Sequence, residues 1–202
     1  MSDFDPILSG NRLMMTARQW RLFACACVRR IEGVTRGSNG GAIDLAERFA
    51  DGKATAHQLA SARYSGRFQP RNAAWAVCWN PDKDPTSMAD RAINWVTGLL
   101  GEGPIWGMSV RARAAYTALF DDIAGHLIEP APFDPLWLAR NDGTVRHLAG
   151  AIYDERAWGN MPILADALED AGCQDERILA HCRGDGPHVR GCWVVDRLLE
   201  LN

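Results

Sequence analysis

Apolar residues recur at intervals of three and four along most of this chain, which is the spacing of one face of an α-helix. The segments with this spacing are short, and most of them begin at a helix-capping residue and end at glycine. In the first segment, Thr16 precedes Trp20, Phe23 and Cys27, which fall on one helical face. No run of alternating, β-branched residues is long enough for a sheet. The pattern therefore predicts an all-α fold, a compact bundle of about nine or ten short helices with no sheet.

The predicted helices extend from one end of the chain to the other. We expect them to begin at or near Thr16, Ala42, Thr55, Ser87, Ser109, Asp134, Asn141, Asn160, Asp175 and Pro187. Three prolines fall between residues 129 and 135, and such a stretch commonly separates two parts of a fold. It divides the chain into an N-terminal helical part, 1–130, and a C-terminal helical part, 131–202, which we expect to form one continuous domain.

The composition is that of an ordinary globular protein. Of the 202 residues, 47% are apolar and 23% are charged, which argues against a disordered chain. The net charge of −3 disfavours nucleic acid as a partner, because sequence-independent binding to DNA or RNA needs an excess of basic residues. No stretch approaches the roughly 20 apolar residues that span a bilayer, so we expect no membrane partner.

The six cysteines bear on where the protein is located. The first residues lack the basic segment and the apolar segment of a signal peptide. Cys25, Cys27 and Cys78 fall in apolar, helix-like segments, as packed thiols do. We therefore expect reduced cysteines and a cytoplasmic location.

Three of the six cysteines and two of the five histidines fall within twenty positions near the end of the chain. His181 and Cys182 end one predicted helix, and after a Gly-Pro turn His188 and Cys192 lie four residues apart at the start of the next. Residues four apart share a helical face, so the turn can bring Cys182, His188 and Cys192 toward one point. Thiolates and imidazoles are zinc ligands, and either His181 or Cys173 would be the fourth.

Three other interpretations of this segment stay open. The spacing lacks the paired C-x-x-C of most structural zinc sites, and free cysteine is among the residues most often buried in cores. Packed thiols with a hydrogen-bonding His188 are therefore the interpretation that we favour. A second interpretation makes Cys182 or Cys192 a nucleophile, with His181 or His188 as its base. A third places an anion at Gly184–His188, before the next helix.

Adjacent acidic residues occur at Asp121–Asp122, Asp154–Glu155 and Glu169–Asp170. Carboxylates that act as a catalytic acid and base must converge in space. Two neighbours in sequence point to different sides of a helix and do not converge. We interpret all three pairs as solvated surface charge.

Two parts of the chain resemble an uncharacterised family of bacterial proteins that is often present in many copies per genome. The blocks that carry the resemblance are RLFACAC followed by two arginines, AERFADG, PILADALEDAGC, ILAHCR and HVRGCWVVD. The resemblance extends around these blocks over both ends of the chain, roughly half of it. It leaves out the middle, about residues 65–130, where this sequence departs from the family. No activity, cofactor or catalytic residue is assigned to that family. The resemblance implies a shared all-α scaffold and no particular reaction.

These observations lead to an ordered set of functional hypotheses. The first, which we favour over an enzyme, is a helical binding or scaffold protein whose partner is another protein. The alternative is a small zinc-binding helical domain with the metal at Cys182, His188, Cys192 and His181. The second alternative is a cysteine-dependent enzyme that uses the same turn.

Overall fold

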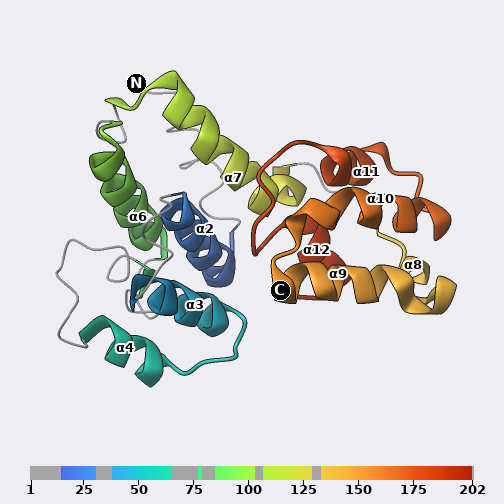
Figure 1. Ribbon diagram of the computed structural model, residues 1–202, viewed down its shortest axis with the longest axis horizontal. Coiled ribbons are helices and arrows are strands. Elements are labelled where there is room, and N and C mark those ends of the chain that lie inside the picture. Colours follow the sequence, from blue (N-terminus) through green and yellow to red (C-terminus); the bar gives the residue numbers. More distant parts are fainter. Residues whose placement is uncertain are drawn as a thin grey trace. The chain divides into compact units, whose positions relative to one another are not determined.

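The computed structural model describes residues 15–30, 38–64, 77–78, 85–102, 107–128 and 133–201. These residues form ten α-helices, two short 3-10 helices and no β-strand (Figure 1), so the all-α prediction is confirmed. The contacts of the chain divide it into two compact units, Met1–Phe120 and Asp121–Asn202. The division falls within helix α7 (Val110–Ile128), ten positions before the boundary that we expected after residue 130.

The first unit is built around helix α2 (Ala17–Arg29). Helix α2 packs against α3 (Ser38–Ala50) and α6 (Pro85–Leu100), and α3 packs against α4 (Ala56–Tyr64) (Figure 1). Every residue from 19 to 28 on α2 is buried. Apolar residues lie all round this helix, as expected of one that is enclosed by others.

Local hydrogen bonds explain where α2 begins. The hydroxyl of Thr16 accepts a hydrogen bond from the backbone N–H of Gln19 at 3.2 Å, and the Gln19 side chain accepts one from the Thr16 N–H at 2.9 Å. This reciprocal pair is a capping box, which satisfies two N–H groups that an isolated helix leaves unpaired. The helix start predicted at Thr16 is confirmed.

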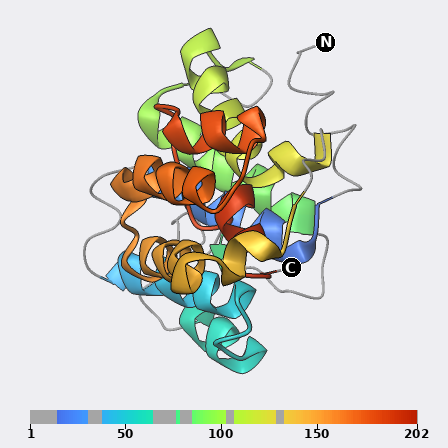
Figure 2. The same cartoon turned by 90° about the vertical axis from the view of Figure 1, so that its right-hand side faces the viewer.

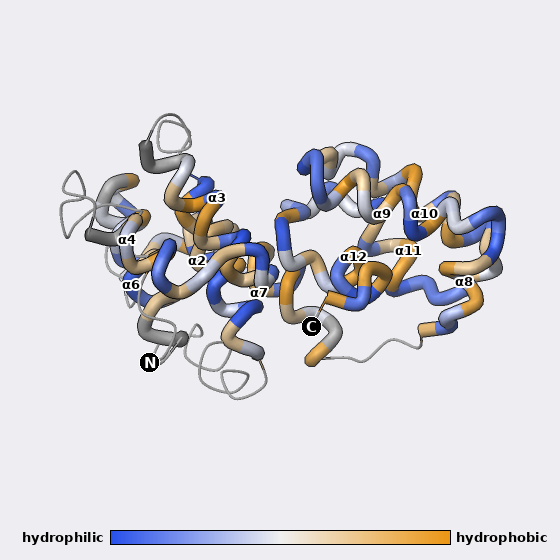
Figure 3. The backbone as a smooth tube through the Cα atoms, turned by 90° about the horizontal axis from the view of Figure 1, so that it is seen from below, coloured by the Kyte–Doolittle hydropathy of each residue, from blue (hydrophilic) through white to orange (hydrophobic). Residues whose placement is uncertain are grey.

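The second unit contains the end of α7 and the remaining helices. These are α8 (Leu136–Ala139), η2 (Asn141–Gly143), α9 (Thr144–Glu155), η3 (Trp158–Asn160), α10 (Met161–Asp170), α11 (Glu176–Arg183) and α12 (Trp193–Leu198). Helix α10 packs against α9 and α11, and the short α12 contacts both α9 and α11. Figure 2 shows α12 between those two helices. Figure 3 shows hydrophobic and hydrophilic residues interspersed along each helix, as amphipathic helices require.

Three of the predicted helix starts are wrong. Helix α3 begins at Ser38, four positions before the start that we expected at Ala42. Helix α6 begins at Pro85, because proline suits the first turn of a helix, and Ser87 therefore lies inside the helix instead of capping it. The helix predicted from Pro187 begins only at Trp193. Gly191 has a φ of 96°, a left-handed conformation that glycine adopts readily and that interrupts an α-helix. Residues 184–192 consequently form a non-helical connection from α11 to α12.

Candidate metal centre

Four side chains in the second unit bring potential metal-ligating atoms together. Asp122 comes from α7, His181 from α11, His188 from the connection at 184–192, and Cys192 immediately precedes α12. One ligand atom from each residue lies within 4.8 Å of the other three. We call these four residues the Asp-His-His-Cys cluster.

Four of the six distances between ligand atoms can be compared with the edges of a tetrahedral zinc site. Asp122 Oδ1 lies 2.9 Å from His188 Nδ1 and 3.2 Å from His181 Nε2. Cys192 Sγ lies 3.3 Å from His181 Nε2 and 4.0 Å from His188 Nδ1. Nitrogen, oxygen and sulfur ligands bound about 2.0–2.3 Å from a tetrahedral zinc ion lie about 3.3–3.6 Å from one another. These four distances, from 2.9 to 4.0 Å, span the tetrahedral value, and all four ligand atoms lie within 4.8 Å of one another, so parts of the cluster would have to contract to hold a zinc ion.

The carboxylate of Asp122 is held in one orientation. Its Oδ2 accepts a hydrogen bond from the backbone N–H of Val189 at 2.9 Å, which fixes the connection before α12 to α7. Its Oδ1 is left facing both histidines. Asp122 thus presents a single oxygen to the centre of the cluster, as a monodentate ligand would.

His181 is positioned by helix α11 and by Trp193. Asp175 caps α11, because its Oδ1 accepts hydrogen bonds from the N–H groups of Arg177 and Ile178 at 3.0 and 3.1 Å. The helix start predicted at Asp175 is confirmed. At the other end of α11, the indole N–H of Trp193 donates to His181 Nδ1 at 3.3 Å.

The cluster is almost entirely shielded from solvent. Asp122 is 3% exposed and Cys192 is 0% exposed, while the side chain of His188 is 7% exposed and that of His181 is 19% exposed. Nε2 of His188 is buried and has no hydrogen-bond partner among the described residues. Burying a carboxylate with so little access to water is costly unless cationic or hydrogen-bonding groups surround it.

Burial and hydrogen bonding act in opposite directions on the two anionic groups. Burial raises the pKa of Asp122, but hydrogen bonds from His181 and His188 outweigh it and bring that pKa below its ordinary value. Burial, together with the charge of Asp122, raises the pKa of the Cys192 thiol well above its ordinary value. A thiolate at this position therefore needs a compensating cation, such as a coordinated metal ion.

Three of the four predicted metal ligands are in the cluster, namely His181, His188 and Cys192. Cys182 is not in it. The Cys182 side chain is fully buried in the apolar core of the second unit, and burial raises its pKa to about 12. Cys173, the other candidate for a fourth ligand, is 2% exposed and packs in that same core.

The residue that sequence reasoning missed is Asp122. We interpreted the Asp121–Asp122 pair as solvated charge; Asp121 is exposed, but Asp122 is buried. Asp122 follows Leu119 by three positions and so lies on the buried face of α7, with Leu119 at 4% exposure. That spacing is the signal in the sequence that marks Asp122 as different from its neighbour.

The cysteines of both units are buried. None of the six takes part in a disulfide, namely Cys25, Cys27, Cys78, Cys173, Cys182 and Cys192. No described helix combines the length and the apolar character needed to cross a bilayer.

Comparison with protein-family models, with curated proteins and with solved structures finds no match for this chain. The fold and the site alone therefore define its class. It is an all-α protein whose C-terminal unit encloses a buried Asp-His-His-Cys cluster.

Proposed function

We propose that the unit Asp121–Asn202 is a small zinc-binding helical domain, with the ion held by Asp122, His181, His188 and Cys192. The observation that supports this most is the convergence of one oxygen, two nitrogens and one sulfur within 4.8 Å of one another. In this proposal Asp122 replaces Cys182 of the predicted ligand set.

The types of ligand favour zinc over other common metal ions. Magnesium and calcium prefer oxygen ligands and rarely use thiolate or imidazole. One thiolate, two imidazoles and one carboxylate are all established ligands of zinc, which takes four of them in a tetrahedron. The cluster provides one ligand for each tetrahedral position.

The role that we propose for the ion is structural. Catalytic zinc sites keep one position for water or substrate, whereas structural sites are filled by four protein ligands. The four ligands come from α7, α11, the connection at 184–192 and the start of α12. An ion at this point would cross-link these elements, and its binding energy would add to the stability of the unit.

The geometry does not favour the cysteine-dependent enzyme. A catalytic histidine uses one ring nitrogen to activate the nucleophile and the other to contact the orienting carboxylate. Here Nε2 of His181 faces both Asp122 Oδ1 and Cys192 Sγ, and Nδ1 of His188 also faces both. Each histidine thus directs one atom to the centre, as ligands do. Cys192 is also fully buried, whereas a nucleophile must reach its substrate.

The binding or scaffold role predicted from the sequence is compatible with a structural zinc ion. Such an ion would stabilise the helices that a protein partner contacts. The partner stays a prediction.

Metal analysis of the tag-free, full-length protein tests the zinc proposal. We expect about one zinc per chain in the wild type, loss of that zinc in Cys192→Ala, and retention in Cys182→Ala. The two cysteines make a matched pair because both are fully buried in the same core and only Cys192 is in the cluster. Zinc that survives in Cys192→Ala, or a wild type that binds none from zinc-containing buffer, would refute the proposal.

A further inference from the structure

The contact between Trp193 and His181 runs against the usual arrangement around a metal-binding histidine. A ligating histidine normally donates its second ring N–H to a carboxylate, a carbonyl or water. In this structure the second nitrogen of His181, Nδ1, instead accepts a hydrogen bond from the Trp193 indole N–H at 3.3 Å. An indole nitrogen only donates, so Nδ1 carries no proton while this bond exists.

This hydrogen bond fixes where the ring proton of neutral His181 lies. A neutral imidazole has one N–H, and with Nδ1 as an acceptor the proton is on Nε2. That nitrogen faces Asp122 Oδ1 at 3.2 Å and Cys192 Sγ at 3.3 Å. The proton therefore occupies the lone-pair direction that a metal ion in the cluster would need.

A metal ion at Nε2 reverses this arrangement. Coordination uses the Nε2 lone pair, so the single proton of the neutral ring must be carried by Nδ1 instead. It can transfer through solvent, since the His181 side chain is 19% exposed. The Nδ1–H and the indole N–H would then point at each other, and the Trp193 hydrogen bond is lost.

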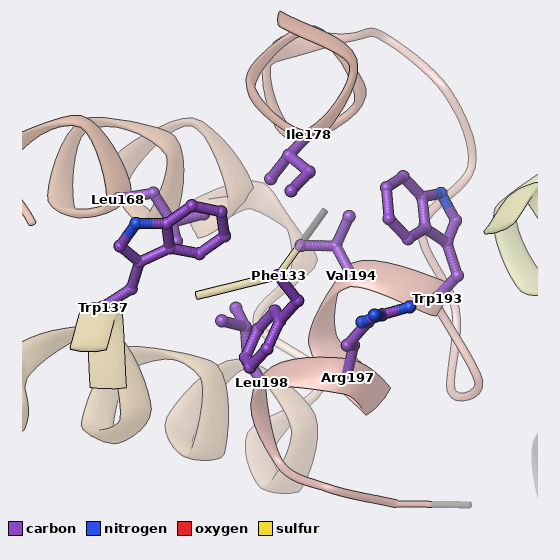
Figure 4. A pocket seen from close by; sticks show the side chains of 8 residues that line it. All are labelled: Phe133, Trp137, Leu168, Ile178, Trp193, Val194, Arg197 and Leu198. Atoms are coloured by element: carbon purple, nitrogen blue, oxygen red, sulfur yellow. The ribbon is translucent and has the colours of Figure 1, made fainter. Parts of the chain in front are cut away.

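The surroundings of Trp193 determine the direction in which its indole can move. On one side is Gly125 of α7, where even a Cβ atom would lie only 3.2 Å from Trp193 Nε1. On the other side is a small apolar pocket that is partly open to solvent. The pocket walls include Phe133, Ile178 and Val194. Figure 4 shows the six-membered ring of Trp193 directed into this pocket and its nitrogen on the far side.

We infer that Trp193 regulates the zinc site: its indole holds His181 in the metal-free form, and zinc displaces it toward the apolar pocket. This inference rests on the proposed function. It makes Trp193 a positioning residue, which acts on the ion through His181. It also means that zinc binding changes the shape of the pocket beside α12.

The test compares two tryptophan variants of the full-length protein, Trp193→Phe and Trp137→Phe. Both tryptophans line the same pocket and are buried to the same degree, at 6% and 7% exposure. Only Trp193 contacts the cluster. Zinc affinity is measured by competition with a chromogenic chelator. We expect Trp193→Phe to bind zinc about fivefold more tightly than the wild type, the equivalent of one hydrogen bond removed from the competing state. Trp137→Phe should match the wild type.

If Trp193 merely supported the site, its replacement would weaken zinc binding instead of strengthening it. Equal or weaker binding by Trp193→Phe therefore overturns the inference, while zinc in the wild type leaves the proposed function standing. No zinc in either protein overturns both.

A second measurement uses the wild-type protein. It therefore does not depend on whether Trp193→Phe folds. The indole ¹⁵N–¹H signal of Trp193 is assigned from the backbone assignment of the wild-type protein. We expect zinc to shift this signal and to move the proton of His181 to Nδ1, as read from the imidazole ¹⁵N shifts. A Trp193 signal that is unchanged by bound zinc contradicts the displacement.

Discussion

The two units of this protein each bury a carboxylate, and they compensate its charge in different ways. In the first unit Glu47 of α3 is 2% exposed, and the guanidinium of Arg29 binds both of its oxygens, at 2.7 and 3.1 Å. In the second unit Asp122 is equally buried but faces two imidazoles and, beyond them, a thiol. The first unit provides a permanent cation. The second provides groups that are cationic only when protonated and that are also metal ligands.

This difference indicates which of the two buried sites would depend on a bound metal ion to balance its charge. Burial lowers the pKa of Arg29, but its hydrogen bonds to Glu47 and Asp44 outweigh this and raise that pKa above its ordinary value. The ion pair of the first unit is therefore complete. The Asp-His-His-Cys cluster has one thiol whose ionised form has no cation beside it, and a zinc ion would supply the missing charge.

Asp122→Ala should have the largest effect on stability. It leaves two buried imidazoles and the Val189 N–H without their acceptor, and breaking a buried charged network costs about 3 kcal/mol. Zinc should no longer stabilise the protein, because the oxygen ligand is gone. Urea unfolding with and without zinc measures both effects. A variant that zinc stabilises as much as it does the wild type would show that Asp122 is not a ligand.

Arg29→Met should have the next largest effect, and one that does not depend on zinc. Glu47 then keeps its burial but loses the cation that binds both its oxygens. We expect a loss of about 2 kcal/mol, less than for a fully enclosed pair because the Arg29 side chain is 22% exposed. Parallel urea unfolding with zinc and with chelator should give the same loss. If zinc changed the loss of stability in Arg29→Met, the two units would not differ in their dependence on zinc.

Gly125→Ala should have the smallest effect. The added methyl would lie 3.2 Å from Trp193 Nε1, so the indole must shift, at a net cost of about 1 kcal/mol. Gly150 of α9 is the control, because a Cβ there meets nothing within 4 Å, and alanine should stabilise that helix by about 1 kcal/mol. Thermal unfolding of the two variants should therefore give shifts of opposite sign. Equal shifts would mean that Trp193 is not confined by α7.

The features that sequence alone predicts well are those set by neighbours in the chain. Thr16 and Asp175 cap their helices through groups only two or three residues away, so the pattern of residues contains the whole interaction. The helix expected from Pro187 failed because the left-handed conformation of Gly191 is available to glycine but not required by it. A glycine in a sequence permits such a break without specifying it.

The candidate site was predicted only in part, because only some of its residues are close neighbours in the chain. His181, His188 and Cys192 lie close together in the sequence, but Asp122 is 59 positions before His181 and comes from another helix. Only tertiary packing brings it to the cluster. Cys182 was a plausible ligand by proximity to His181, yet adjacent helical residues point about 100° apart. His181 therefore reaches the cluster, while Cys182 points into the core.

The most direct test of the zinc site is the zinc K-edge X-ray absorption spectrum of the full-length protein loaded with one equivalent of zinc. The proposed ligands predict one sulfur at about 2.3 Å and three nitrogen or oxygen atoms at about 2.0–2.1 Å. Two sulfur ligands would mean that Cys182 or Cys173 binds the ion, in place of Asp122. Six light-atom ligands without sulfur would mean that zinc binds elsewhere, and the cluster would then be a hydrogen-bonded core.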